Sequence, residues 1–246
     1  MKWKARVVGH MKVDPNEFVV LDHLQVQGTD YSQRELRKFT SIGSKLERCR
    51  FDNARIEDAS FGSGLEMSEY IECSFDGVRI QHGGGFARFV RCSFRNIDFR
   101  SWLCFGAEFI DCVFTGRLKG CIFNGTLLEQ DQPYLGRVRN EFHGNDFSGA
   151  DLDDVAFRTG IDLTQQRLPC GPEYLYVSDA PRAVAEARSA AQLLADQNLR
   201  MEVLKLLDSF NLGLEGGQRQ FLLRKSNYSV YSRDVIDLVF DFLCGG

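Results

Sequence analysis

Large apolar residues recur at every fifth position through the first two thirds of the chain. The first run of this register comprises Leu21, Val26, Tyr31, Leu36, Ser41, Leu46, Phe51, Ile56 and Phe61, of which only Ser41 is not apolar. After one-residue slips the register continues through Leu65, Tyr70, Phe75 and Ile80, then Phe89, Phe94, Phe99, Cys104, Phe109 and Phe114, then Leu118, Phe123 and Leu128, and after an interruption Phe142, Phe147, Leu152 and Phe157. Neither the 3.6-residue period of a helix nor the simple alternation of a strand gives this spacing.

A smaller residue, commonly Ala or Cys, stands two positions before many of the large ones. A chain with this pattern turns a corner every five residues. Four corners complete a coil of about 20 residues, and successive coils stack at about the 4.8 Å spacing of paired strands. The sequence therefore predicts a mainly β, four-sided solenoid.

The pentapeptides CRFDN, ARIED, ASFGS, CSFRN, NDFSG and ADLDD are similar to the loose motif A-(D/N)-L-x-x, and residues 20 to 163 resemble the pentapeptide-repeat family. The resemblance implies a right-handed, four-sided β-helix. It also implies one family function, because some members mimic duplex DNA, bind type II topoisomerases and protect them from inhibitors or toxins. The chain departs from the pattern in its slips, in its Gly83-Gly84-Gly85 run and in an insertion near Gln130.

Positions about 20 residues apart should share a side of the solenoid. One predicted ladder is Tyr31, Phe51, Tyr70, Phe89 and Phe109, and a second is Leu36, Ile56, Phe75, Phe94 and Phe114. Cys73, Cys92 and Cys112 fall beside the second ladder. We interpret these thiols as small core residues rather than as a metal or redox site, because no histidine stands at a matching position.

Two groups of residues are predicted to bind a partner. Ile71, Val90 and Ile110 form an apolar stripe on the outside of the coils, which needs a cover. We expect the chain's own C-terminal helices to supply that cover, and a partner protein is the alternative. Residues 129–139 break the repeat and should project as a loop, in which Tyr134, Leu135 and Arg137 are residue types favoured at interfaces. The alternative is a neutral insertion.

The pattern predicts three regions: a lead-in at 1–20, the solenoid at 21–168, and a helical segment at 169–246 that caps the solenoid or forms a homodimer. Pro169, Gly171 and Pro172 mark the linker. A first helix should begin near Asp179, a short helix is expected around residues 221–223, and Ser232 should cap the last helix. A helix-turn-helix is disfavoured, because that last helix is acidic and apolar.

Composition narrows the classes of partner and the cellular location that we expect for this protein. The formal net charge of −4, from 30 basic and 34 acidic residues, is too mild to indicate a nucleic-acid or membrane partner. The first residues contain no apolar signal segment, and Asp237 and Asp241 interrupt the most apolar stretch, so we expect a cytoplasmic protein. Eight cysteines include no C-x-x-C pair, and no histidine spacing matches a metal site.

No catalytic or cofactor motif stands out, so we expect a protein that is not an enzyme and has no cofactor or metal. The leading hypothesis is a bacterial protein-binding module of a scaffold, immunity or defence-associated protein. The alternative is a DNA mimic that binds a type II topoisomerase. A run of acidic residues favours the mimic; it comprises Glu141, Asp146, Asp151, Asp153, Asp154 and Asp162. A cluster of basic residues disfavours the mimic; it comprises Arg79, Arg88, Arg91, Arg95 and Arg100.

Overall fold

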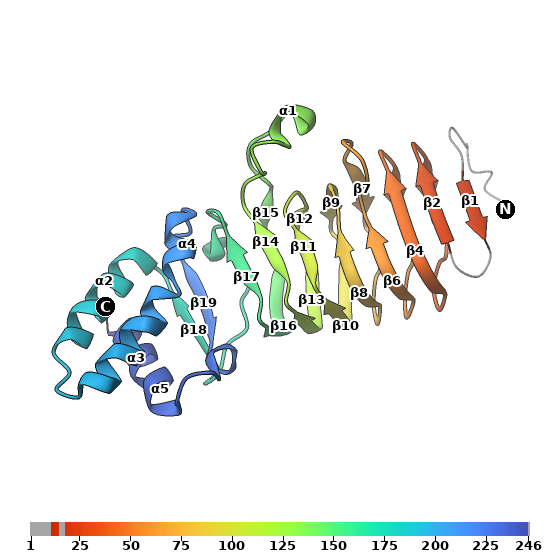
Figure 1. The fold of residues 1–246 in the computed structure, drawn as a ribbon. Helices are drawn as coiled ribbons and strands as arrows, with labels where there is room; N and C mark the ends of the chain where they lie inside the picture. The colour runs from red at the N-terminus through yellow and green to blue at the C-terminus, as the bar shows by residue number, and fades with distance from the viewer. Residues whose placement is uncertain (1–10, 15–17, 246) are drawn as a thin grey trace.

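The computed structural model describes residues 11–14 and 18–245, so most of the predicted lead-in lies outside the described residues. Stacked β-coils form an elongated body, and a helical unit lies at its C-terminal end (Figure 1). This confirms the mainly β solenoid with C-terminal helices. The right-handed winding and the four-sided cross-section stay predictions.

Two parallel sheets run along the solenoid. The main sheet contains β1 (Met11–Asp14), β2 (Phe18–Asp22), β4 (Glu35–Ile42), β6 (Arg55–Ser60), β8 (Arg79–Gly84), β10 (Ser93–Arg100), β13 (Val113–Lys119) and β16 (Asp146–Asp153) in that order, with β11 (Trp102–Cys104), β14 (Ile122–Asn124) and β17 (Ala156–Arg158) beside them. Only β1 is antiparallel to its neighbour among these described strands. The second sheet contains β3 (Gln25–Gln27), β5 (Lys45–Glu47), β7 (Ser68–Ile71), β9 (Ala87–Val90), β12 (Glu108–Ile110) and β15 (Phe142–His143).

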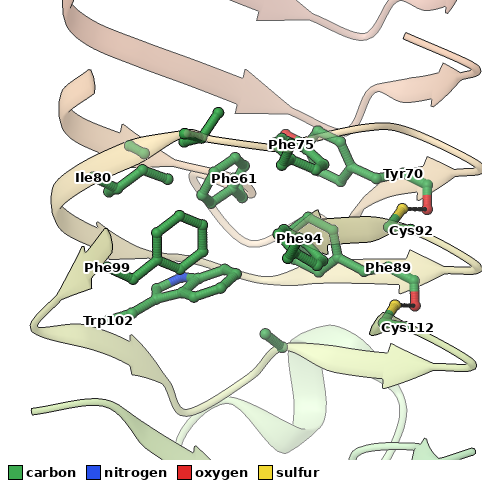
Figure 2. Packing of buried hydrophobic residues seen from close by; sticks show 14 of the residues in the cluster. Phe61, Tyr70, Phe75, Ile80, Phe89, Cys92, Phe94, Phe99, Trp102 and Cys112 are labelled. Carbon is green, nitrogen blue, oxygen red and sulfur yellow. Dashed lines mark hydrogen bonds between the residues drawn. The ribbon is translucent and has the colours of Figure 1, made fainter. Parts of the chain in front are cut away.

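Stacked aromatic rings fill the solenoid (Figure 2). One stack contains Tyr31, Phe51, Phe75, Phe94, Phe114 and Phe147, with ring centroids 4.5–4.8 Å apart. A second contains Tyr70, Phe89 and Phe109, at 4.8 and 5.0 Å. Such pairs contribute about 0.5–1.5 kcal/mol each beyond the burial of their area.

The two predicted ladders were each joined wrongly at one point. Phe51 stacks on Phe75, not on Tyr70, while Tyr70 pairs with Leu46. Ile56 pairs with Ile80 rather than with Phe75. The cause is the segment 62–67, which lengthens one coil and moves every later residue to the next side. Leu65, which we assigned to the core, belongs to this insertion and is exposed.

The cysteine ladder follows from the corners of the coil. Arg48, Glu72, Arg91 and Asp111 each occupy the left-handed backbone region, with φ between 50° and 55°. Each precedes a buried cysteine, in turn Cys49, Cys73, Cys92 and Cys112. The Cys92 thiol donates to the Tyr70 carbonyl at 3.2 Å, and the Cys112 thiol to the Phe89 carbonyl at 3.5 Å (Figure 2). Burial raises the pKa of Cys92, so this thiol stays protonated and fills space as a small core residue.

The C-terminal unit, the helical cap, has a separate hydrophobic core. It comprises β18 (Tyr174–Val177), α2 (Ala180–Gln192), α3 (Gln197–Asp208), α4 (Asn211–Glu215), β19 (Phe221–Arg224), the 3-10 turn η2 (Lys225–Tyr228) and α5 (Arg233–Cys244). Asp179 and Ser232 cap α2 and α5, as predicted. The short helix expected at 221–223 is instead strand β19, which pairs antiparallel with β18. Among the described residues, no helix is long and apolar enough to span a membrane.

The helical cap seals the last coil, near the 3-10 turn η1 (Leu163–Gln165). The buried Gln218 side chain accepts from the backbone of Gly160 and Ile161 at 3.0 and 3.1 Å, and it donates to the Ile161 carbonyl at 2.9 Å. Arg224 pairs with Asp151 at 2.7 Å. These bonds satisfy strand-edge groups that would otherwise be open. The helices therefore do not cover the outer apolar stripe, contrary to our expectation.

Candidate functional site

Residues 126–139 leave the solenoid as one protruding loop (Figure 1). Its neck is antiparallel: Thr126 bridges Arg139, and the Leu127 N–H donates to the Val138 carbonyl at 2.9 Å. Its tip is the short helix α1 (Gln132–Leu135), which ends at Gly136 with φ 63°, a conformation that glycine adopts without strain. The excursion is therefore an ordered hairpin with a helical tip.

A buried ion pair fastens this loop to the solenoid. Glu108 on β12 has a side chain only 1% exposed. Its carboxylate forms ion pairs with Arg137 and with Arg88, each at 2.9 Å, and accepts from the Glu141 backbone N–H at 3.0 Å. Removing one partner of such a pair leaves an uncompensated buried charge, at a cost of about 3–5 kcal/mol. The loop's base is therefore held in one position by strong contacts.

Arg137 also donates within the loop, to the Arg139 carbonyl at 3.0 Å, and it contacts the body of the solenoid. Its guanidinium donates to the Gly106 carbonyl at 3.0 Å and to the Asn140 side chain, and it lies 3.7 Å from the Met67 sulfur. Burial lowers the pKa of Arg137, and the neighbouring Glu108 carboxylate counteracts this effect. We predicted Arg137 as a partner-binding residue, but its side chain is only 18% exposed and serves as the anchor of the loop.

The loop exposes large apolar side chains together with the polar Glu129, Gln130 and Arg139. Tyr134 is 60% exposed, as expected of a contact residue, while Leu135 is half-buried. Leu128 and Val138 are 43% and 56% exposed, and the sequence analysis did not select them. The five-residue register predicted that Leu128 is a core residue, but the neighbouring Leu127 is the buried one.

The predicted stripe lies on the same sheet as the anchor. Ile71, Val90 and Ile110 are register neighbours on β7, β9 and β12. Ile110 is two residues from Glu108, so both side chains point to the outer face. Ile71 and Val90 are half-buried and Ile110 is 7% exposed. The fold thus places the stripe beside the base of the loop, although the stripe presents less open apolar surface than expected.

In the part of the chain that the structure describes, no group of three or more His, Cys, Asp or Glu residues is arranged to hold a metal ion. The six solenoid cysteines are buried, and only Cys170 and Cys244 are exposed among the eight.

The comparisons with known proteins add little. No model of a known protein family matches the chain, and no curated protein matches it significantly. Two solved structures of trypsin-treated variants of QnrB1, described as a plasmid-mediated fluoroquinolone resistance protein, are similar at 14% and 13% identity. Each match covers 62% of this chain and 79% of the other, with TM-scores of 0.18 and 0.16. By its own five-residue period, parallel ladders and stacked core, the chain is a β-solenoid with one protruding loop and a helical cap.

Proposed function

We propose that the protein is a non-enzymatic binding module that contacts a partner protein through the loop 126–139. One observation carries this proposal: a loop that exposes the apolar side chains of Leu128, Tyr134 and Val138 stands on a base fixed by a buried ion pair. A loop ordered before binding loses little conformational freedom on association. Exposed aromatic and aliphatic side chains are typical contact residues.

The cellular setting is part of the same proposal. We place the module in a bacterial cytoplasm, in a scaffold, immunity or defence-associated protein. The helical cap exposes Leu193, Met201 and Leu212, so self-association through the cap is a second proposed contact. Light scattering of the purified full chain, with Leu193→Asp beside it, distinguishes a dimer held by this surface from a monomer.

The DNA-mimic hypothesis requires a continuous negative face, and the charges argue against one. Asp146 pairs with Arg167, Asp151 with Arg224, and Asp153 with Lys119 and Arg117. Glu141 pairs with Arg88. Most of the acidic run is therefore neutralised by neighbouring cations. A topoisomerase partner remains the second candidate, and the same experiment tests it.

The test is affinity capture from a lysate of the native host, followed by mass spectrometry, with three baits: the wild-type chain, Tyr134→Asp and Leu193→Asp. Each variant replaces an exposed apolar side chain with a charged one, the first on the loop and the second on the cap. We expect a partner that Tyr134→Asp loses and Leu193→Asp retains. A partner that only Leu193→Asp loses would contradict the loop proposal. Topoisomerase subunits lost with Tyr134→Asp would select the second candidate.

A further inference from the structure

A groove crosses the outer face of the main sheet, on strands β4, β6, β8 and β10, which lie side by side (Figure 1). Its volume is about 890 Å³. Four arginines line it, Arg37, Arg55, Arg79 and Arg100. Three carboxylates, those of Glu35, Glu57 and Asp98, line it as well. The groove therefore carries mixed charge, and the arrangement of that charge decides what it can bind.

At many positions on the solenoid, charges meet their opposites in the next coil, although Arg100 faces Lys119. On the second sheet, Lys45, Glu69, Arg88 and Glu108 follow one another in register with alternating sign. On the main sheet, Glu35 faces Arg55. The groove breaks this rule, because Arg55 faces Arg79 directly. Like charges opposite one another destabilise a sheet, so this pair needs an explanation.

On its other side Arg79 faces Asp98 of β10 in register, but the Asp98 carboxylate pairs with Arg100 instead. Arg55 lies 3.8 Å from Glu35, and Arg100 lies 3.3 Å from Asp98. Arg79 forms no ion pair or hydrogen bond through its side chain with any residue that the structure describes, and it is exposed at the middle of the groove. On β8, the neutral Gln81 stands at the position that Glu57 occupies on the neighbouring strand β6. The excess of positive charge is thus centred on β8.

A second hollow of about 410 Å³ adjoins the groove and shares His82 and Ser101 with it. Its floor is the glycine run at the end of β8. A Cβ on Gly83 would approach the Trp102 ring to 2.7 Å, so a larger residue is excluded there. The exposed Leu103 borders this hollow. Next to the arginines, the surface therefore offers a recess in which an approaching chain meets backbone and apolar atoms.

We propose that this groove binds an acidic segment of a partner protein, with one carboxylate held between Arg55 and Arg79. Neighbouring strands lie about 4.8 Å apart, so two guanidinium groups on them can reach one carboxylate. Arginine binds carboxylates with paired, charge-assisted hydrogen bonds. The three lining carboxylates disfavour a polyanion with a charge on every unit, and they therefore favour a peptide with spaced acidic side chains over a nucleic acid. This surface belongs to the main sheet, so the proposal does not depend on the loop.

The test is fluorescence anisotropy with the full chain at low, fixed ionic strength. The probe is a fluorescein-labelled peptide of alternating glutamate and glycine, and its glutamine counterpart is the uncharged control. We expect Arg79→Gln to weaken binding of the acidic peptide by about tenfold or more. The matched variant Arg91→Gln also removes one positive charge, but from an arginine that is paired with Glu72. This variant should bind the acidic peptide as tightly as the wild type does. The glutamine peptide should not bind.

Three results would overturn the proposal. One is a wild type that does not bind the acidic peptide, and another is equal binding by the two variants. The third is tighter binding of labelled duplex DNA than of the peptide, with the same dependence on Arg79. Thermal unfolding provides a further readout. Since Arg79 has no intramolecular partner among the described residues, Arg79→Gln should melt at or above the wild-type temperature, and a marked loss of stability would show that the residue has a structural role instead.

Discussion

The solenoid and the helical cap are held together in different ways. In the solenoid, flat rings stack along one axis, and each coil packs mainly against its neighbours. In the cap, α2 presents small side chains such as Ala187 to branched residues of α3 and α5, such as Leu206 and Val239, all fully buried. The difference shows that one chain uses a repeating interface where length is needed and irregular helix packing where the repeat must end.

The junction between them combines apolar contacts with polar bonds, since Tyr174 and Leu222 of the cap pack against the solenoid core. Besides Gln218, the side chain of Gln220 accepts from the Leu163 N–H at 2.6 Å, and Asn227 accepts from the Asp154 N–H at 3.1 Å. The two hydrophobic cores are separate clusters. We therefore expect the two regions to unfold as distinguishable units, which the following predictions test.

The largest expected effect is on the solenoid. Phe94→Asp would place an unpaired carboxylate between the rings of Phe75 and Phe114, at a cost above about 4 kcal/mol. Hydrogen exchange should show lost protection across the solenoid strands. Leu103→Asp changes an exposed side chain nearby and should melt like the wild type. Equal melting of Phe94→Asp and wild type would refute the core assignment.

A smaller effect should remain within the helical cap. Leu206 is fully buried, and Leu206→Ala should cost about 2–5 kcal/mol through lost burial and a residual cavity. Exchange should accelerate in α2, α3 and α5 while the strands β4 to β13 keep their protection. Uniform acceleration along the chain would instead indicate that the two regions unfold as a single cooperative unit.

The smallest expected effect is a pH dependence of the solenoid's stability. His23 contacts Asp22 at 2.5 Å and Glu66 at 2.7 Å, and these two carboxylates raise its pKa above 6.5. Only the imidazolium can donate from both ring nitrogens. Because the folded-state pKa is raised, the stabilisation is fully present below about pH 6.5 and is lost as pH rises through the folded-state value. NMR titration should place the pKa of His23 above 6.5, and Glu66→Gln should lower it; an unchanged value would remove Glu66 as a cause.

Much of the fold could be predicted because the determining signal is local. A five-residue period places Phe94 and Phe114 in the core whatever their neighbours are. The same reasoning placed Cys92 and Cys112 in a small-residue row, and Asp179 at the start of a helix. These features depend on residues a few positions apart, and short-range geometry fixes them.

What only the tertiary structure decided depends on which coil meets which. The extra residues at 62–67 moved every later ring to the next side, and no local pattern reveals such a shift. The inward turn of Arg137 depends on Glu108, which lies 29 positions away and is the carboxylate within reach only after the coils stack. The cap sits on the last coil because Gln218 finds open backbone groups there. The sequence by itself determined the repeat and its core, and the contacts between coils decided the register, the anchoring of the loop and the place of the cap.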